Sequence, residues 1–241
     1  ILDSTETTDQ LSWSFSSGSE AFNGLAAGEQ LSLTYTVRVT DSAGATADKA
    51  IGILVTGSND APLVTGISSV AGNITELAET SPIAGQAGTT RTDSGSFAIG
   101  DVDLLDVQSV SVTPPAGARG NMVASVANNT TGDGQGSVAW TYSVTDAALN
   151  PLASGQVVNE VYTITVSDGR GGSVNQLVTV TLTGSNDQPL LSSAIATLPN
   201  GNELSPYSFS KAQLLQGFSD PDLSDGLEID PNSVVAVGGV I

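Results

Sequence analysis

The chain has 241 residues, with six lysines and arginines against 25 aspartates and glutamates, and its formal charge is −19. A charge of this size repels nucleic acid phosphates and anionic membrane surfaces, which argues against both as partners. The sequence holds no histidine and no cysteine, so a Ser-His-Asp triad, a cysteine nucleophile, a disulfide and a thiolate or imidazole metal site are excluded within it.

A long internal repeat organises the sequence. The tetrapeptide at 57–60, Gly-Ser-Asn-Asp, returns at 184–187 with a period of 127 residues, and residues 11–62 share 18 of 52 positions with residues 138–189. Identities spread along a fixed period are typical of tandem domains. We therefore expect a longer array, of which this chain contains three pieces: the back part of one module (1–60), a complete module (61–187) and the front part of a third (188–241).

The expected elements are short strands. In residues 35–40, and again in 162–167, large apolar side chains occupy every second position, which indicates strands with one buried face. Partner strands at 51–56 and 177–183 follow across loops rich in glycine and aspartate, so both pairs are expected to be hairpins. Other predicted strands are 11–15, 94–99, 107–112 and 138–144.

Helix is nearly absent from the pattern. One short helix is expected at 211–216, with Ser210 as its N-cap. Many short strands with turn residues between them are typical of an all-β sandwich. We expect Trp13 and Trp140, which occupy the same place in the repeat, to lie in the core rather than to stack on sugars. No apolar run approaches the ~18 residues of a membrane span, and no signal peptide is visible.

Several stretches resemble a known family. Phe22–Leu31, Tyr35–Asp41 and Thr56–Pro62 look like a VCBS repeat, as does Ala148–Pro189. Phe209–Leu215 followed by Phe218–Asp222 is more similar to a bacterial cadherin-like module. The resemblance implies tandem immunoglobulin-like (cadherin-like) β-sandwich modules arranged as a rod, within giant secreted adhesins of the repeats-in-toxin (RTX) type. It also implies secretion to the bacterial cell surface.

Strand direction predicts which acidic residues meet between modules. In an antiparallel sandwich, the turn of the last hairpin lies where the preceding linker arrives, so Asp168 is expected beside Asn59 and Asp60. The loop after the second strand faces the same end and brings Asp101 and Asp103. With backbone carbonyls and water, these groups approach the six to eight oxygen ligands that calcium takes.

A second joint repeats the same residue types in the next linker and loop: Asn186, Asp187, Asp220 and Asp222. The cadherin resemblance implies an upstream glutamate as well, for which Glu76 and Glu79 are the candidates. Asp41 marks the corresponding end of the first module. Asparagine, aspartate and glycine also form ordinary solvated turns, but recurrence of the whole set favours Ca²⁺ at the joints.

Motifs for catalysis fail on inspection. Ser208–Lys211 fits Ser-x-x-Lys without its companion motifs, and Gly134–Ala139 leads into a strand instead of a helix. Residues 220–231 begin like an EF-hand loop, but its twelfth position is Pro231. A carboxylate pair for glycoside hydrolysis stays formally open, but the acidic residues gather at the joints. We expect no enzyme.

The function expected from these observations is a calcium-rigidified extender of a large bacterial surface adhesin. It would be a monomeric rod that projects a distal domain for cell adhesion or biofilm formation, with calcium ions and neighbouring repeats as its partners. One alternative is a module that binds a glycan or peptide directly through residues 114–136. Another is an accessory domain of a secreted hydrolase.

Overall fold

The computed structural model describes residues 12–18, 22–78, 88–195, 197–198, 200–202 and 206–233. The strands are β1 (Gln30–Thr40), β2 (Thr46–Thr56), β3 (Leu63–Ile67), β4 (Ala71–Thr75), β5 (Thr90–Gly100), β6 (Ser109–Thr113), β7 (Asn121–Asn128), β8 (Gln135–Thr145), β9 (Val157–Ser167), β10 (Ser173–Thr183), β11 (Leu190–Leu191) and β12 (Phe218–Ser219). Helical segments are α1 (Lys211–Leu214) and two 3-10 turns, Asp146–Ala148 and Pro231–Ser233. None of the helices in the described ranges is long and apolar enough to cross a membrane.

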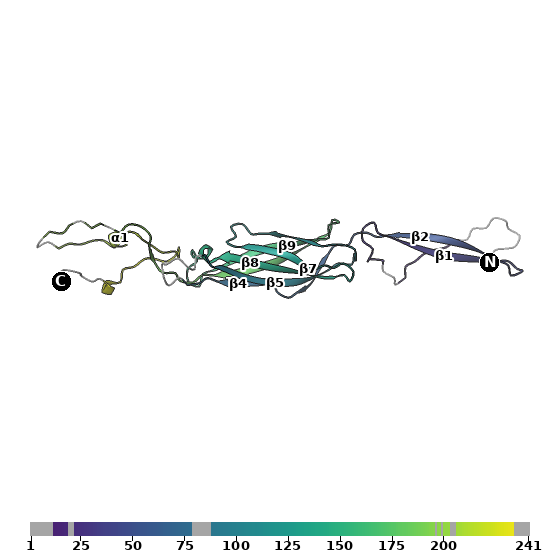
Figure 1. The fold of residues 1–241 in the computed structure, drawn as a ribbon, viewed down its shortest axis with the longest axis horizontal. Coiled ribbons are helices and arrows are strands. Elements are labelled where there is room, and N and C mark those ends of the chain that lie inside the picture. Colours follow the sequence, from purple (N-terminus) through teal and green to yellow (C-terminus); the bar gives the residue numbers. More distant parts are fainter. Residues whose placement is uncertain are drawn as a thin grey trace.

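Strands β3 to β10 form a sandwich of two four-stranded sheets (Figure 1). One sheet has the order β3-β5-β8-β7 and the other β4-β10-β9-β6. All neighbours pair antiparallel except β4 and β10, which are parallel. β3 and β4 together correspond to one first strand that is divided between the two sheets. Counted in this way, the strand order is that of immunoglobulin constant-type domains. The predicted all-β, immunoglobulin-like fold is confirmed.

The sandwich core is built where alternating side chains of the two sheets meet. Tyr162 and Ile164 of β9 and Val180 and Leu182 of β10 are buried, as the period-2 pattern predicts. Trp140 of β8 is only 1% exposed, and its indole nitrogen donates to the Ser69 carbonyl at 2.9 Å. The prediction of Trp140 as a core residue is confirmed.

The β1–β2 hairpin differs from its counterpart β9–β10. It pairs in continuous register from Gln30–Thr56 to Thr40–Thr46, yet no second sheet covers it within the part of the chain that is described. Trp13 is therefore 57% exposed, and the prediction of Trp13 as a core residue is wrong for this structure. Of the strand predicted at 11–15, Leu11 lies outside the described residues and the other four form no strand.

Other boundaries moved by a few residues. The strand predicted at 107–112 is β6, which begins at Ser109. The predicted helix is α1, and it ends at Leu214 instead of Gln216. Its N-cap is confirmed, because Ser210 Oγ accepts from Gln213 N at 3.2 Å and Gln213 Oε1 accepts from Ser210 N at 2.8 Å.

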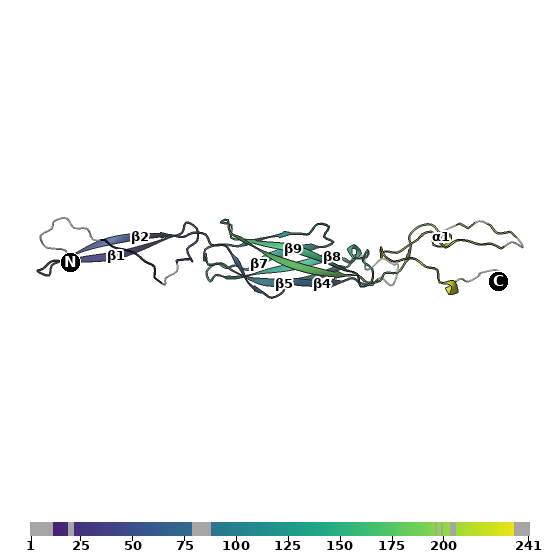
Figure 2. The ribbon, with the colours of Figure 1, turned by 180° about the vertical axis from the view of Figure 1, so that it is seen from behind.

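The molecule is elongated, with its parts in one line. The β1–β2 hairpin, the sandwich and the segment that carries α1 follow one another along the longest axis (Figures 1 and 2). Residues 57–62 connect the first two parts, and residues 184–189 connect the last two. We call these two connections the first and the second joint.

Candidate metal centre

Each joint begins at a position that only glycine can occupy. A Cβ at Gly57 would lie 2.2 Å from the Leu25 carbonyl oxygen, and one at Gly184 would lie 2.3 Å from the Leu152 carbonyl oxygen. Gly184 N also donates to the Gln156 carbonyl at 2.9 Å. The first residue of each linker therefore packs against a loop that precedes it in the chain, at Leu25 and at Leu152. This contact fixes the position at which each linker starts.

At the first joint, the linker bonds to two loops of the sandwich. Asn59 Nδ2 donates to Asp168 Oδ2 at 2.9 Å, and the Asp60 N–H donates to Asp103 Oδ2 at 2.8 Å. The Asp103 N–H in turn donates to Asp101 Oδ1 at 3.0 Å. The five residues that strand direction predicts at this joint therefore lie together in the structure.

The second joint reproduces this bonding pattern. The Asp187 N–H donates to Asp222 Oδ2 at 3.0 Å, and the Asp222 N–H donates to Asp220 Oδ1 at 3.0 Å. Asn186 Nδ2 donates to the Asp187 carbonyl at 2.9 Å, as Asn59 Nδ2 does to the Asp60 carbonyl at 3.1 Å. The linker and the acidic loop are thus one recurring unit.

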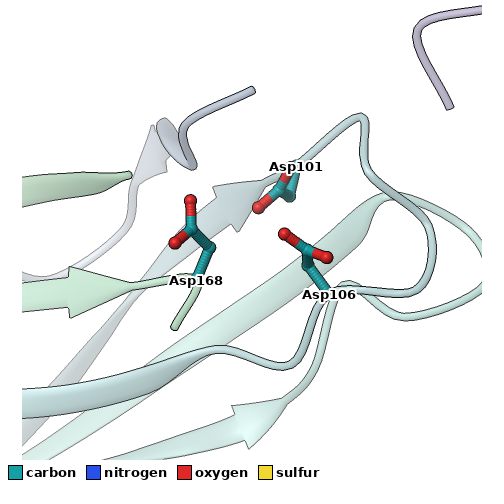
Figure 3. A group of neighbouring side chains, drawn as sticks. All are labelled: Asp101, Asp106 and Asp168. Carbon is teal, nitrogen blue, oxygen red and sulfur yellow. The ribbon is translucent and has the colours of Figure 1, made fainter. Parts of the chain in front are cut away.

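Asp106 completes the acidic cluster at the first joint, and it was not predicted. The side chains of Asp101, Asp106 and Asp168 point toward one another (Figure 3), and one carboxylate oxygen from each lies within 4.8 Å of the other two. All three residues are buried. The sequence held a signal: Asp-Val-Asp-Leu-Leu-Asp at 101–106 recurs as Asp-Pro-Asp-Leu-Ser-Asp at 220–225.

The cluster contains acceptors that no donor reaches within the described part of the chain. They are Asn59 Oδ1, Asp103 Oδ1 and Asp106 Oδ2. A buried polar oxygen without a hydrogen bond is destabilising by roughly 1–3 kcal/mol. Asp106 has a counter-charge on its other oxygen, from Arg170, and Asp103 forms no ion pair among the described residues. A cation held between these oxygens would remove that penalty.

The pKa shifts at the first joint follow from burial and hydrogen bonding. Burial raises the pKa of Asp101 and of Asp106, and the neighbouring carboxylates act in the same direction. Burial also acts to raise the pKa of Asp168, but hydrogen bonds from Asn59 Nδ2 and from backbone N–H groups of its turn outweigh it and lower that pKa. These hydrogen-bond donors therefore stabilise the ionised form of Asp168.

Glu76 stands at the upstream side of the second joint. It is 3% exposed, its Oε2 accepts from the Ser185 N–H at 2.9 Å, and its carbonyl accepts from Ser185 Oγ at 2.9 Å. Burial raises the pKa of Glu76 to about 7 despite the hydrogen bond from Ser185, and the charges of Asp187, Asp146 and Asp222 contribute. Glu79, the other candidate, lies outside the described residues.

Asp146 is a second residue that sequence reasoning missed. It is fully buried in the turn after β8, and its Oδ1 accepts from the Leu77 N–H at 3.0 Å. Its Oδ2, like Glu76 Oε1 and Asp222 Oδ1, meets no hydrogen-bond donor among the described residues. No signal pointed to it, because the repeat places Ser19 at the equivalent position.

Asp41 shows that the β1–β2 and β9–β10 hairpins are closed by the same kind of turn. Its Oδ1 accepts from Ala43 N at 2.9 Å and Ala45 N at 2.8 Å. Asp168 Oδ1 accepts from Arg170 N at 2.7 Å and Gly172 N at 3.0 Å in the same way. The two aspartates therefore have the same structural role in the two turns.

Residues 114–136, considered above as a glycan or peptide site, do not form one long loop. They include β7, Arg119 Nη1 donates to the Ala148 carbonyl at 2.8 Å, and Thr130 is fully buried. The Ser-x-x-Lys stretch ends in Lys211, whose Nζ pairs with Glu228 on the surface.

No family model matches the chain, and no curated protein matches it. Among solved structures, mouse clustered PcdhgC3 EC1-3 is 14% identical with a TM-score of 0.35, covering 67% of this chain and 44% of that one. The SrpA adhesin from Streptococcus sanguinis is 16% identical with a TM-score of 0.33, covering 58% and 69%. Protocadherin Gamma B2 cadherin domains 1-5 are 14% identical with a TM-score of 0.30, covering 72% and 29%. These are likenesses only, and the fold assignment rests on the strand order.

Proposed function

We propose that this chain is a calcium-stiffened spacer of an extracellular adhesion protein on a bacterial cell surface. One observation carries the proposal: both joints bury side-chain oxygens that no donor reaches among the described residues. At the first joint they belong to Asn59 of the linker and to Asp103 and Asp106 of the sandwich, and at the second to Glu76 and Asp146 of the sandwich and to Asp222 after the linker. A cation bound there would tie consecutive modules together.

The chemistry of the donors favours calcium. All candidate ligands are oxygens of Asp, Glu and Asn, together with backbone carbonyls, and calcium takes six to eight such ligands in flexible geometry. Magnesium requires a stricter octahedron and keeps several waters. The first joint offers Asn59, Asp60, Asp101, Asp103, Asp106 and Asp168. The second offers Glu76, Asp146, Asn186, Asp187, Asp220 and Asp222.

Binding would act mechanically. The first set joins the linker to loops of the sandwich, and the second joins the linker to the sandwich before it and to the acidic loop after it. A bound ion would therefore restrict rotation at each joint. Without an ion, like charges crowded at one end repel one another. Extracellular calcium modules have dissociation constants on the order of 0.1–1 mM, which suits control by external calcium.

The rest of the proposal follows from composition and resemblance. The chain has no cysteine, so metal ions would take the stiffening role that disulfides have in many secreted proteins. The VCBS and RTX-adhesin resemblance supports a monomeric rod that carries a distal adhesive domain and has no catalytic activity. Its partners would be calcium and neighbouring repeats.

Calorimetric titration with calcium tests the proposal. We expect wild-type protein to bind calcium at both joints, Asp103→Asn to lose binding at the first and Asp222→Asn at the second. Asp48→Asn is the matched control, because Asp48 pairs with Arg38 on the surface of the β1–β2 hairpin. Absence of binding in the wild type, or equal loss in all three variants, would contradict the proposal.

A further inference from the structure

The first joint contains a cation of its own, the guanidinium of Arg170. Arg170 lies in the turn between β9 and β10 of the sandwich, and its Nε lies 2.5 Å from Asp106 Oδ1. Its Nη1 donates to the Ala27 carbonyl at 3.1 Å, on the other side of the joint. One side chain therefore contacts both the acidic cluster and the preceding module.

The turn does not need an arginine for its own structure. The equivalent turn between β1 and β2 has Ala43 at this position of the repeat, and the same backbone N–H groups bond to Asp41. Gly44 and Gly171 both have positive φ, +88° and +111°. Because the same turn forms with alanine or with arginine, the arginine side chain is not needed for the turn itself. Its contacts are made with residues at the joint instead.

Burial makes this contact different from an ordinary surface ion pair. Exposed pairs contribute about 0–1 kcal/mol, but the Asp106 side chain is 0% exposed while that of Arg170 is 40% exposed. A buried carboxylate depends on its counter-charge. The hydrogen bond to a backbone carbonyl of the neighbouring module also fixes the direction of the guanidinium.

We propose that Arg170 is the built-in counter-ion of the first joint, which holds the two modules together without calcium and competes with calcium for Asp106. Calcium bound among Asp101, Asp106 and Asp168 would stand close to the positive guanidinium, and the two cations repel each other. Arg170 would have to withdraw from Asp106 as calcium binds. Only this second, competitive part rests on the proposed calcium function.

Spin labels placed across the first joint test the calcium-independent part. Thr36→Cys in β1 and Ser125→Cys in β7 are exposed positions on opposite sides of it, and the chain contributes no other cysteine. In chelator, we expect Arg170→Ala to broaden the measured distance distribution. Arg38→Ala, which breaks the ion pair with Asp48 inside one hairpin, should leave it unchanged. Equal distributions for Arg170→Ala and the wild type would overturn the proposal.

Calorimetry in an Asp222→Asn background tests the competitive part. We expect Arg170→Ala to tighten calcium binding at the first joint by about three- to tenfold, and Arg38→Ala to leave it unchanged. Weaker or unaltered binding in Arg170→Ala would overturn the competition. If the wild type binds no calcium at all, the proposed function fails, while the measurement in chelator still decides whether Arg170 ties the modules together.

Discussion

Individual aspartates at the joints each do two things with their two oxygens. Asp103 and Asp222 use Oδ2 to accept the linker N–H, which positions the linker, and leave Oδ1 without a donor among the described residues. Because an N–H needs only one acceptor, the second oxygen is available to a cation. Positioning and binding are therefore combined in one side chain.

Glu76 gives the second joint a pH dependence whose sign can be worked out. Its pKa in the folded chain is about 7, above the ordinary value of 4.5, so between these values the folded state keeps a proton that the unfolded state has lost. Stability in chelator therefore falls as pH rises from about 5 to 7. We expect Glu76→Gln to reduce this slope when melting temperature is measured against pH.

Glu29→Gln is the control for that experiment. Glu29 also accepts a backbone N–H, that of Ala26 at 3.0 Å, but it lies in the first module. Calcium binding at the second joint should also strengthen over the same pH range in the wild type, because the ion displaces the proton of Glu76. An unchanged slope in Glu76→Gln would show that another group is responsible.

Some of the acidic residues at the joints could be predicted from the sequence, and others could not. Asp101, Asp103 and Asp168 could be grouped because strand direction alone decides which loops share an end of a sandwich. Asp106 needed the six-residue recurrence at 220–225 to be noticed. Asp146 reaches the second joint from the β8–β9 turn, and only the packed structure reveals that proximity.

At the scale of elements, the close packing at the start of each linker requires glycine, and substitution tests this. We expect Gly184→Ala to destabilise the sandwich by about 1–3 kcal/mol, because its Cβ would lie 2.3 Å from the Leu152 carbonyl oxygen. Gly52→Ala in β2 is the matched control, since a Cβ there meets nothing within 4 Å. Thermal melting measures both, and equal melting temperatures for the two variants would contradict the steric argument.

Elements with strong alternation were predicted well, and those without it were not. β9 and β10 alternate cleanly because one face of each is buried in the core. β6 has only five residues but alternates serine with valine, whereas the five-residue strands β3 and β4 have glycine at a position that alternation would give to a large apolar side chain or beside one. The alternation of β7 is interrupted by polar and small residues. Trp13 obeys the same pattern as Trp140, but burial depends on a facing sheet, which a pattern within one strand cannot guarantee.

At the scale of the whole molecule, the joints decide the shape. Three parts lie in line (Figure 1), and the contacts across the joints include the linker hydrogen bonds and the Arg170 bridge. Beside them lie acidic oxygens that no donor reaches among the described residues. The carboxylates crowded at each joint repel one another when no cation is bound, which weakens the joints. The central claim is that calcium stabilises the straight form.

Small-angle scattering of the chain in millimolar calcium and then in chelator tests this claim most directly. With calcium, we expect a large maximum dimension and a profile typical of a straight rod. In chelator, the maximum dimension should fall and the profile should show bending, and Asp103→Asn with calcium should lie between the two. Identical profiles in calcium and chelator would contradict the account.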